Sequence, residues 1–427
     1  MSVSPARSAA FDILLRIERE RAFSSVLLPI YEEALSQEDR ALCHELVLGT
    51  LRRLLKLDRG IDELAEGRKL DIEVRIALRL GLYQLLVLSK IPVRAAINES
   101  VELVKRAKKR SATGFVNALL RRASRQPLEF TYTDELDRIS IEASHPKWLL
   151  AKWASQLGAD AAYQLAVSNN EAAKTAFRII GAADANVAEL RASATPSNWV
   201  DGCYLLDRST PLVRKLAVDG KIYLQDEASQ MVAQAAEVPK GGRFLDVCAA
   251  PGGKTGLVAA NTNPELAVAG DLYQPRVELL RDNCRRQGVD VQVVRYDAQT
   301  ALPFEEAAFD VVLIDAPCSG TGTVRHNPEI RYSLAPSDIE ELSNKQRRIR
   351  VEASKAVKKG GLLIYSTCSL ESEEGEDVAG WFLEQNSGFL AVKPRVPASF
   401  ITEAGFARTW PHRDDMDGFF IAAFQRV

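Results

Sequence analysis

From about Gly220 onwards, short apolar runs alternate with helical stretches, and this alternation constrains the fold more than any other feature of the chain. The runs are GRFLDVC, ELAVAGD, VDVQVVRYD, FDVVLIDAP and GGLLIYSTCS. Continuous runs of Val, Ile and Leu with helices between them are typical of a parallel sheet that helices cover on both faces. We therefore expect residues 221–427 to form a Rossmann-like α/β domain.

The first part of the chain has a different pattern. Stretches such as FDILLRIERE, RALCHELVLGTLRRLLKLDRGI, DIEVRIALRLGLYQLLVLS and TGFVNALLRRAS carry apolar residues at i, i+3, i+4 and i+7. This spacing predicts helices that each bury one face. The connections are short and contain Gly or Pro, so residues 1–128 are predicted to form an all-helical bundle.

Residues 129–220 are predicted to form a small mixed α/β subdomain after the polar connection Gln126–Asp134. HPKWLLAKWASQLG has the pattern of an amphipathic helix, and TAFRII and CYLLD have that of short strands. Two interpretations stay open for this part: a nucleic-acid platform that includes Arg178, or a plain connecting subdomain. The whole chain is then a multidomain α and α/β protein.

The charge is distributed unevenly. The net charge is −2, yet residues 1–125 hold 23 Lys and Arg against 16 Asp and Glu. The run Lys105–Arg110 has five cations in six positions, and Arg121, Arg122 and Arg125 follow it. This run has two interpretations, a solvated helix end or a patch that contacts nucleic-acid phosphates.

The six cysteines are widely spaced, without a C-x-x-C pair and without a matching His pattern, so no metal site is predicted. Met1–Ala10 lacks the pattern of a signal peptide. The longest apolar-rich stretch, Ile76–Ile91, contains Arg79, Gln84 and Lys90, which argues against a membrane span. We expect a cytosolic monomer with reduced thiols.

Each apolar run of the α/β domain ends in an acidic or small polar residue, and ligands bind beyond the carboxyl ends of parallel strands. These residues, expected to line one crevice, are Asp246, Asp271, Asp297, Asp315 and Ser366.

The first run continues into the small-residue loop Asp246–Thr255, which has three possible interpretations. A phosphate-binding P-loop needs Gly where Cys248 stands, and a dinucleotide fingerprint ending at Gly256 needs Gly where Pro251 stands. The third is the loop of a class I methyltransferase, which holds the methionine part of S-adenosylmethionine. Asp271, 25 residues after Asp246, is near the ~20-residue spacing of ribose-binding carboxylates. Asp297 is then placed for the adenine amino group.

Two cysteines follow the next two strands, Cys318 in DAPCSGTG and Cys368 in YSTCS. A thiolate that adds to carbon 6 of a pyrimidine turns carbon 5, a poor nucleophile, into one that can accept a methyl group. A base must then remove the carbon 5 proton, and a donor at N3 must stabilise the charge on the ring. Asp315 is placed for the role at N3.

Asp246–Thr255, Asp315–Gly322 and Ser366–Ser369 resemble the signature motifs of the RNA cytosine-5 methyltransferases, and the similarity covers roughly residues 220–427. Ala96–Leu103 and Gly114–Arg121 resemble the NusB RNA-binding helical domain. This fusion is similar to the RsmB (Sun/Fmu) type of the family, whose substrate is a cytosine of 16S ribosomal RNA. The resemblance implies a partner that is naked or early-assembly 16S ribosomal RNA.

The resemblance also implies residue roles. Cys368 matches the nucleophile, Cys318 matches the second cysteine that assists product release, and Asp315 matches a residue of the cofactor site that also serves as a base. The implied cofactor-binding set is Cys248, Ala249, Ala250, Pro251, Gly252, Gly253, Lys254, Asp271, Asp297 and Asp315. Residues 172–179 depart from the proline-rich Arg-Val-Asn segment that is frequent in the family, which leaves RNA contacts there unassigned.

Three alternative functions differ in what they require of the sequence. A non-catalytic RNA-binding ribosome-assembly factor predicts loss of a thiol or of the cofactor loop, and this chain keeps both. A nucleotide hydrolase predicts a complete P-loop, which this chain lacks. The same methyl transfer to tRNA is compatible with the catalytic motifs, and only the NusB-like part favours ribosomal RNA.

Overall fold

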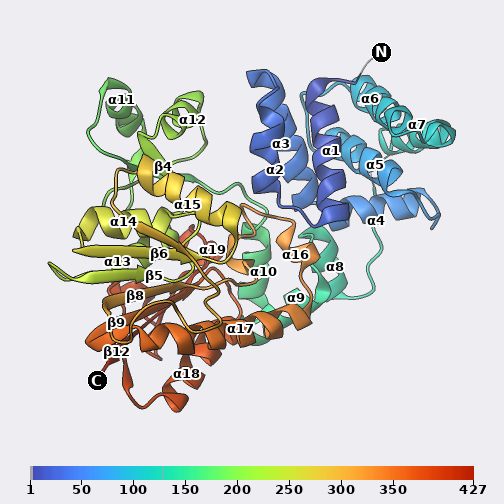
Figure 1. Ribbon diagram of the computed structural model, residues 1–427. Coiled ribbons are helices and arrows are strands. Elements are labelled where there is room, and N and C mark those ends of the chain that lie inside the picture. Colours follow the sequence, from blue (N-terminus) through green and yellow to red (C-terminus); the bar gives the residue numbers. More distant parts are fainter. Residues whose placement is uncertain (1–2, 127) are drawn as a thin grey trace. The chain divides into compact units, whose positions relative to one another are not determined.

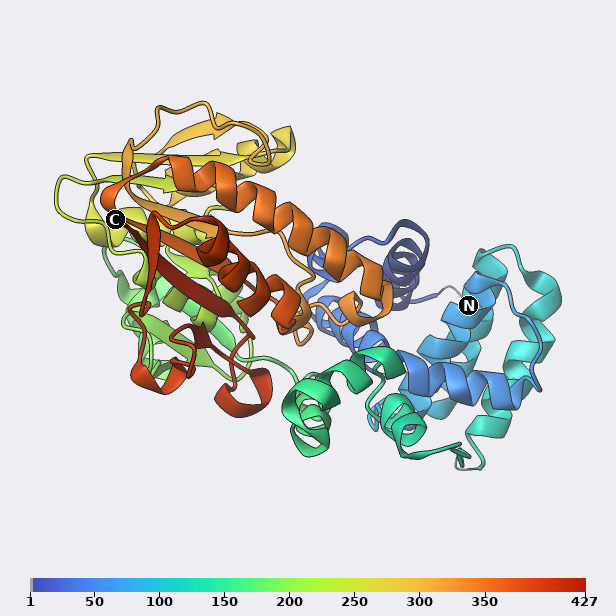
Figure 2. The same ribbon diagram turned by 90° about the horizontal axis from the view of Figure 1, so that it is seen from below.

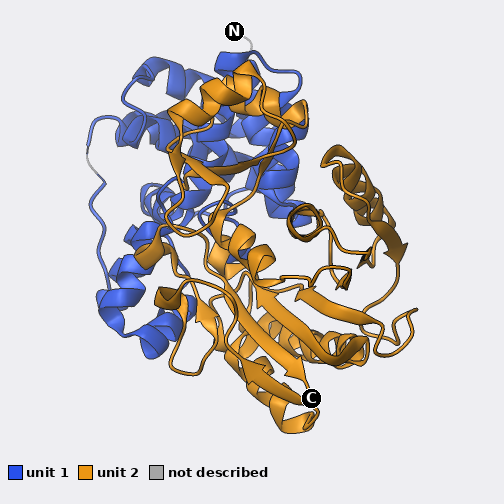
Figure 3. Ribbon diagram, turned by 90° about the vertical axis from the view of Figure 1, so that its left-hand side faces the viewer, with its two compact units in different colours: residues 1–172, 324–333 blue, residues 173–323, 334–427 orange. Residues whose placement is uncertain are grey.

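The computed structural model describes residues 3–126 and 128–427. Positions 1 and 2 of the stretch Met1–Ala10, and position 127 of the predicted connection Gln126–Asp134, lie outside the described residues. The chain divides into two compact units, which Figure 3 colours blue and orange. The helical unit comprises residues 1–172 and 324–333, and the sheet unit comprises residues 173–323 and 334–427.

The helices of this unit between residues 5 and 123 contribute to one apolar core. Apolar periodicity explains the helices, and local signals explain their ends. Ser36, for example, accepts a hydrogen bond from the backbone N–H of Asp39 and so caps a helix N-terminus. The helices are α1 Pro5–Glu20, α2 Ser24–Glu32, α3 Gln37–Arg52, α4 Leu54–Leu64, α5 Ile72–Leu86, α6 Val93–Arg106, α7 Thr113–Ala123, α8 Glu135–Glu142, α9 Lys147–Leu157, α10 Ala159–Ser168 and α16 Ile330–Ser333.

Residues 324–333 belong to the helical unit although they lie late in the sequence. The Tyr332 hydroxyl donates hydrogen bonds to the carbonyl oxygens of Leu51 and Ser144, at 2.8 and 2.9 Å. The buried Glu329 accepts from the backbone N–H of Ser24 at 2.6 Å. These polar contacts anchor the segment because buried polar groups need partners.

A small antiparallel sheet opens the sheet unit, and its strand order is β2-β3-β1-β4. The predicted strands TAFRII and CYLLD correspond to two of its members, β1 Thr175–Ile179 and β3 Cys203–Leu206. The others are β2 Thr195–Pro196 and β4 Ile222–Leu224. Phe177 and Ile222 pack with residues of α11 Ala185–Ser193 and α12 Pro211–Val218 in a core of their own.

The large sheet of this unit has the order β10-β12-β9-β8-β5-β6-β7, with β11 paired to β12. The neighbours from β9 to β7 run parallel, whereas β12 runs antiparallel to both β9 and β10. The strands are β5 Arg243–Asp246, β6 Leu266–Asp271, β7 Gln292–Arg295, β8 Phe309–Asp315, β9 Val357–Thr367, β10 Phe389–Val392, β11 Ala407–Arg408 and β12 Phe420–Arg426.

Helices cover both faces of the large sheet. The helices α13 Glu227–Ala235, α14 Gly253–Thr262 and α15 Gln274–Arg286 lie on one face, and α17 Pro336–Lys355 and α18 Glu376–Gln385 lie on the other (Figure 1; Figure 2). Alternate strand residues therefore enter different cores: Phe244 packs in the cluster that includes α13 and α14 residues, and Leu245 in the cluster that includes α17 and α18 residues. The expected fold class, a helical part joined to a Rossmann-like α/β part, is confirmed.

The strand order of the large sheet changes direction at β5. The chain passes from β5 outwards to β6 and β7, and then returns to the other side of β5 with β8 and β9. At such a switch point the loops that follow neighbouring strands diverge and leave a crevice outside their carboxyl ends. We call the side of the sheet where the loops after β5 and β8 begin the carboxyl edge. Within the described residues, no helix combines the length and apolar character needed to cross a bilayer.

Candidate active site

The loop between β5 and α14 accepts only small residues at its centre. Gly252 has a φ of 99°, a left-handed conformation that favours glycine. A Cβ atom there would lie 2.8 Å from Leu280 Cδ1, and one on Gly253 would lie 2.9 Å from Tyr223 Cε1. Gly252 is also the N-cap of α14, whose first amides face the carboxyl edge. The residues present thus fit a ligand that approaches the backbone closely.

Asp246 fixes the start of this loop from inside the protein. Its carboxylate accepts a hydrogen bond from the Thr255 hydroxyl at 2.7 Å and is 1% exposed. Burial raises the pKa of Asp246 to about 7, because a carboxylate loses its hydration there. Burial also raises the pKa of the Cys248 thiol, so this residue contributes a small neutral side chain to the loop.

Asp271 ends β6 beside the same loop. Its carboxylate accepts hydrogen bonds from the backbone N–H groups of Ala250 and Leu272, at 3.3 and 2.9 Å, and forms an ion pair with Arg276 at 3.1 Å. Arg276 also donates to the Ala250 carbonyl at 2.8 Å. Three groups therefore hold Asp271, the residue predicted to bind the ribose, at the loop. The half-exposed Arg276 side chain covers Asp271 from the solvent side.

Asp297 follows β7, two positions beyond its last residue. It is half-buried, and its carboxylate accepts from the backbone N–H of Gln299 at 2.9 Å. The structure therefore gives Asp297 a local turn bond, and its second carboxylate oxygen is the group with which it can meet a ligand.

Asp315, at the end of β8, forms an ion pair with Lys254 of α14. The distance between Lys254 Nζ and Asp315 Oδ2 is 2.7 Å, and the Ser366 hydroxyl donates to the other carboxylate oxygen at 2.9 Å. Lys254 Nζ also lies 5.0 Å from the centre of the Phe419 ring. The pair joins the first loop to the strand that leads to Cys318.

The two cysteines of the predicted catalytic set meet at the carboxyl edge. Cys318 lies in the loop after β8 and Cys368 directly follows β9, and their Sγ atoms are 3.3 Å apart. Both side chains are partly accessible. Hydrogen bonding to Cys368 and burial raise the pKa of Cys318 well above its ordinary value. Three of the other cysteines, Cys43, Cys203 and Cys284, are buried elsewhere.

Arg178 does not form a nucleic-acid platform. Its side chain is 6% exposed and donates to the Gly253 carbonyl at 3.2 Å, and its guanidinium lies over the Tyr223 ring. Burial lowers the pKa of Arg178 to about 10. The residue therefore braces the small sheet against the start of α14, because a buried guanidinium stays where carbonyl and aromatic partners hold it.

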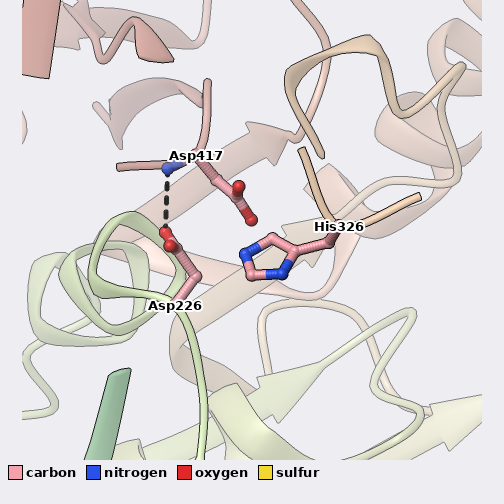
Figure 4. Close-up of side chains that lie close together, drawn as sticks. All are labelled: Asp226, His326 and Asp417. Atoms are coloured by element: carbon pink, nitrogen blue, oxygen red, sulfur yellow. Dashed lines mark hydrogen bonds between the residues drawn. The ribbon is translucent and has the colours of Figure 1, made fainter. Parts of the chain in front are cut away.

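A second brace joins the loop before β12 to the N-terminus of α13. The backbone N–H of Asp417 donates to Asp226 Oδ1 at 3.2 Å (Figure 4), and Asp226 also caps α13 by accepting from the N–H of Ala228. Gly418, the next residue, approaches the loop after Cys318 so closely that a Cβ on Gly322 would lie 1.9 Å from the Gly418 carbonyl oxygen.

Sequence reasoning missed one acidic residue of this site. Glu374 is fully buried, and its carboxylate accepts hydrogen bonds from Ser319 and Ser369, which follow the two cysteines. It stands in the acidic run Glu371–Asp377, where the sequence pattern indicates a solvated turn. Glu374 lies six positions after Cys368 in the sequence, and nothing in this spacing distinguishes it from the neighbouring acidic residues.

The fold and the carboxyl edge together define a methyltransferase with a Rossmann-like, S-adenosylmethionine-binding domain. Residues 233–425 match the family described as 16S rRNA methyltransferase RsmB/F, and residues 4–125 match the NusB family.

Whole-chain similarity agrees with these matches. The chain is 32% identical to the probable ribosomal RNA small subunit methyltransferase B of Bacillus subtilis, over 100% of both chains. It is 30% identical to ribosomal RNA small subunit methyltransferase B of Pseudomonas putida, over 99% of this chain and 98% of that one. The solved structure of PH0851 superposes with a TM-score of 0.87 at 25% identity, over 100% of both chains. The chain belongs to the 16S rRNA methyltransferase RsmB/F family, and its cofactor is S-adenosylmethionine, as expected.

Proposed function

We propose that this protein methylates carbon 5 of a cytosine in 16S ribosomal RNA through a transient covalent bond between Cys368 and carbon 6 of the ring. The observation that carries the proposal is the pair of thiols, 3.3 Å apart at the carboxyl edge. Cys368 acts electrostatically on Lys254, which follows the small-residue loop and forms an ion pair with Asp315. A solvent-accessible thiol next to a lysine is the setting in which a cysteine acts as a nucleophile.

The chemistry starts with the Cys368 thiolate, which forms a bond to carbon 6 and pushes electron density to carbon 5 and N3. Bound S-adenosylmethionine would supply the electrophilic methyl group for carbon 5, with S-adenosylhomocysteine as the leaving group. In its protonated form Asp315 donates a hydrogen bond to N3 and stabilises the negative charge there, and in its carboxylate form it is the proposed base for the carbon 5 proton. As that proton leaves, the electrons of the broken carbon 6–sulfur bond return to Cys368 and restore its thiolate.

The contact between the thiols supports different roles for the two cysteines. The raised pKa of Cys318 keeps this group protonated, so it can donate a hydrogen bond to the Cys368 sulfur. A thiolate that leaves carbon 6 is a better leaving group when a neighbouring donor stabilises its charge. We assign Cys318 to the release step for this reason. Both thiols act on one base, which requires a single-stranded or flipped cytosine.

The proposed cofactor set is the one that the sequence predicts. The loop Cys248–Lys254 would hold the methionine part, Asp271 the ribose hydroxyls and Asp297 the adenine amino group. The close approaches at Gly252 and Gly253 support the first assignment, and the anchoring of Asp271 at the loop supports the second.

The proposed organisation keeps the boundaries that the sequence predicts: a NusB-like RNA-binding part at 1–128, a linker and mixed subdomain at 129–220, and the methyltransferase at 221–427. The seven-charge cationic excess of residues 1–125 supports an RNA role for the first part. The proposed partner is naked or early-assembly 16S ribosomal RNA, bound by a cytosolic monomer.

The test is to map the product. The full-length protein is incubated with S-adenosylmethionine and, separately, with unmodified 16S ribosomal RNA and a tRNA pool, and methylated nucleosides are identified by mass spectrometry. The proposal predicts 5-methylcytidine at one site of the 16S transcript. Methylation of another atom would contradict the covalent chemistry. Methylation of tRNA alone would show that the substrate is tRNA and not 16S ribosomal RNA.

A further inference from the structure

Glu374 occupies a position between the two cysteine loops. It ends the short 3₁₀ turn Ser372–Glu374, which lies between β9 and α18, and its side chain is 0% exposed. A buried carboxylate is costly unless several donors compensate it. Four hydrogen bonds converge on its two oxygens, which is the full capacity of the group.

Three of these bonds come from the residues that directly follow the cysteines. The Ser319 backbone N–H donates to Glu374 Oε1 at 2.9 Å, and the Ser319 hydroxyl donates to Oε2. The Ser369 hydroxyl donates to Oε2 at 2.6 Å. One carboxylate therefore binds the loop of Cys318 and the loop of Cys368 at equivalent positions, and the two serine hydroxyls are themselves 3.0 Å apart.

Residues of α17 and β9 also hold Glu374 in place. Gln346 of α17 donates to Glu374 Oε1 at 2.9 Å and to the carbonyl of Pro317, the residue before Cys318, at 3.0 Å. The buried Tyr365 of β9 donates to the Glu374 carbonyl oxygen at 2.7 Å. Side chains fixed in this way have little freedom to shift, so the carboxylate acts as a rigid link.

We infer that Glu374 is a positioning residue that sets the separation of the Cys318 and Cys368 sulfurs. The two loops arise from different strands, and the Glu374 carboxylate accepts hydrogen bonds from both Ser319 and Ser369. The catalytic meaning of this link rests on the proposed function. The geometric claim does not, because it concerns the two sulfur atoms in the free protein.

The geometry can be measured without RNA or cofactor by using phenylarsine oxide, whose arsenic atom binds two neighbouring thiols at once and releases water. Binding through both sulfurs is much tighter than binding through one, because the second bond forms within the complex. Glu374→Ala should weaken the binding of phenylarsine oxide at least about tenfold. Glu374→Gln, which keeps one acceptor oxygen and the shape of the side chain, should weaken it less. Cys318→Ser leaves Cys368 without its partner thiol, so the difference between this variant and the parent protein gives the part of phenylarsine oxide binding that requires both thiols.

A matched control separates geometry from general destabilisation. Asp310, at the opposite end of β8, accepts from the Arg243 backbone N–H at 2.7 Å and from Lys358 Nζ at 2.8 Å. Asp310→Asn should change the melting temperature but leave the affinity for phenylarsine oxide unchanged. Alkylation by iodoacetamide, which reacts with one thiol at a time, is the control that measures whether Cys368 stays accessible in each variant.

Steady-state kinetics link the geometry to the reaction. In Glu374→Ala, kcat should fall on the order of a hundredfold, the cost of displacing reacting groups by about 1 Å, while the affinity for S-adenosylmethionine is unchanged. Wild-type affinity for phenylarsine oxide in folded Glu374→Ala and Glu374→Gln would overturn the inference. Weakened arsenical binding with wild-type kcat would uphold the positioning role and would contradict the proposed covalent chemistry instead.

Discussion

Lys254 Nζ lies 2.7 Å from Asp315 Oδ2, and this ion pair connects the cofactor loop to the strand that precedes Cys318. Burial alone would lower the pKa of Lys254, but the charge of Asp315 and its hydrogen bond raise that pKa above its ordinary value. The charge of Cys368 acts on the lysine in the same direction. Lys254 is therefore a cation at neutral pH, and we propose that it stabilises the thiolate that Cys368 forms during the reaction.

The first prediction concerns this lysine. Lys254→Met should slow the alkylation of Cys368 by iodoacetamide several-fold at pH 7, because the thiolate loses a stabilising charge. The reaction is followed by mass spectrometry of the peptide that contains Cys368. Lys358→Met is the matched control, since Lys358 pairs with Asp310 at the other end of β8. Equal alkylation rates in both variants would show that Lys254 does not act on the thiol.

The second prediction uses the buried Asp246. Its pKa of about 7, against an ordinary 3.8, means that the folded protein keeps a proton that the unfolded chain loses between these values. The contribution of Asp246 to the free energy of unfolding therefore falls as the pH rises from about 4 to about 7, and the loss is complete above that range. Asp246→Asn lacks this loss and still offers Thr255 an acceptor.

Urea unfolding of Asp246→Asn and of the parent protein at several pH values checks this sign. The difference in free energy of unfolding should shift in favour of the variant as the pH rises through this window, by on the order of a few kcal/mol, and then stay level. A difference that does not vary with pH would mean that Asp246 is ionised throughout.

The fold was largely predictable because its signals are local. The runs that became β5, β6, β8 and β9 are continuous and apolar, as strands buried on both faces must be. Their acidic or small polar ends then indicated which residues meet at the carboxyl edge, since parallel strands end on one side. The proposed roles of Asp271, Asp315 and Cys368 depend on this simple rule.

The remaining features depend on interactions between distant positions. The grouping of residues 324–333 with the helical unit relies on partners such as Ser24 and Leu51, hundreds of positions away. Arg178 looked like a surface cation, but its partners Gly253 and Tyr223 bury it. Glu374 has the same residue type as the neighbouring acids of the run Glu371–Asp377, which include the exposed Asp377, and only the tertiary structure reveals its donors.

The third prediction tests the placement of the ribose. Asp271→Ala should weaken the binding of S-adenosylmethionine by about 2–3 kcal/mol, the value of a charge-assisted pair of hydrogen bonds. Isothermal titration calorimetry measures the affinity directly. Asp282→Ala is the control, because Asp282 is an exposed acid of α15 that forms a local ion pair with Arg285. Equal affinities of the two variants would remove Asp271 from the cofactor site.

The fourth prediction concerns the run Lys105–Arg110. Three of its cations pair with acids of the helical unit: Lys105 with Glu102, Arg106 with Asp12 and Lys109 with Asp71. Lys108 and Arg110 are exposed, and we expect them to bind most of the phosphates. Lys108→Gln with Arg110→Gln should lower the slope of log affinity against log salt by about 0.7–0.9 for each phosphate that is no longer neutralised.

Filter binding to a 16S ribosomal RNA transcript at several salt concentrations gives this slope. Replacing all five cations of the run with Gln should lower the slope little further than the double variant does. Lys358→Gln with Lys359→Gln is the control for the double variant, because it removes the same number of positive charges. A slope that stays the same in the five-fold variant would identify the run as a solvated helix end.

The central claim is covalent catalysis by Cys368 with Cys318 in the release step, and trapping of the protein–RNA adduct tests it most directly. Cys318→Ala and Cys368→Ala are each incubated with 16S ribosomal RNA and S-adenosylmethionine and then run on a denaturing gel. Cys318→Ala should give a retarded protein–RNA band because the adduct forms and is not resolved, and Cys368→Ala should give none and no methylation. A retarded band from Cys368→Ala alone, or full activity in both variants without any band, would contradict the account.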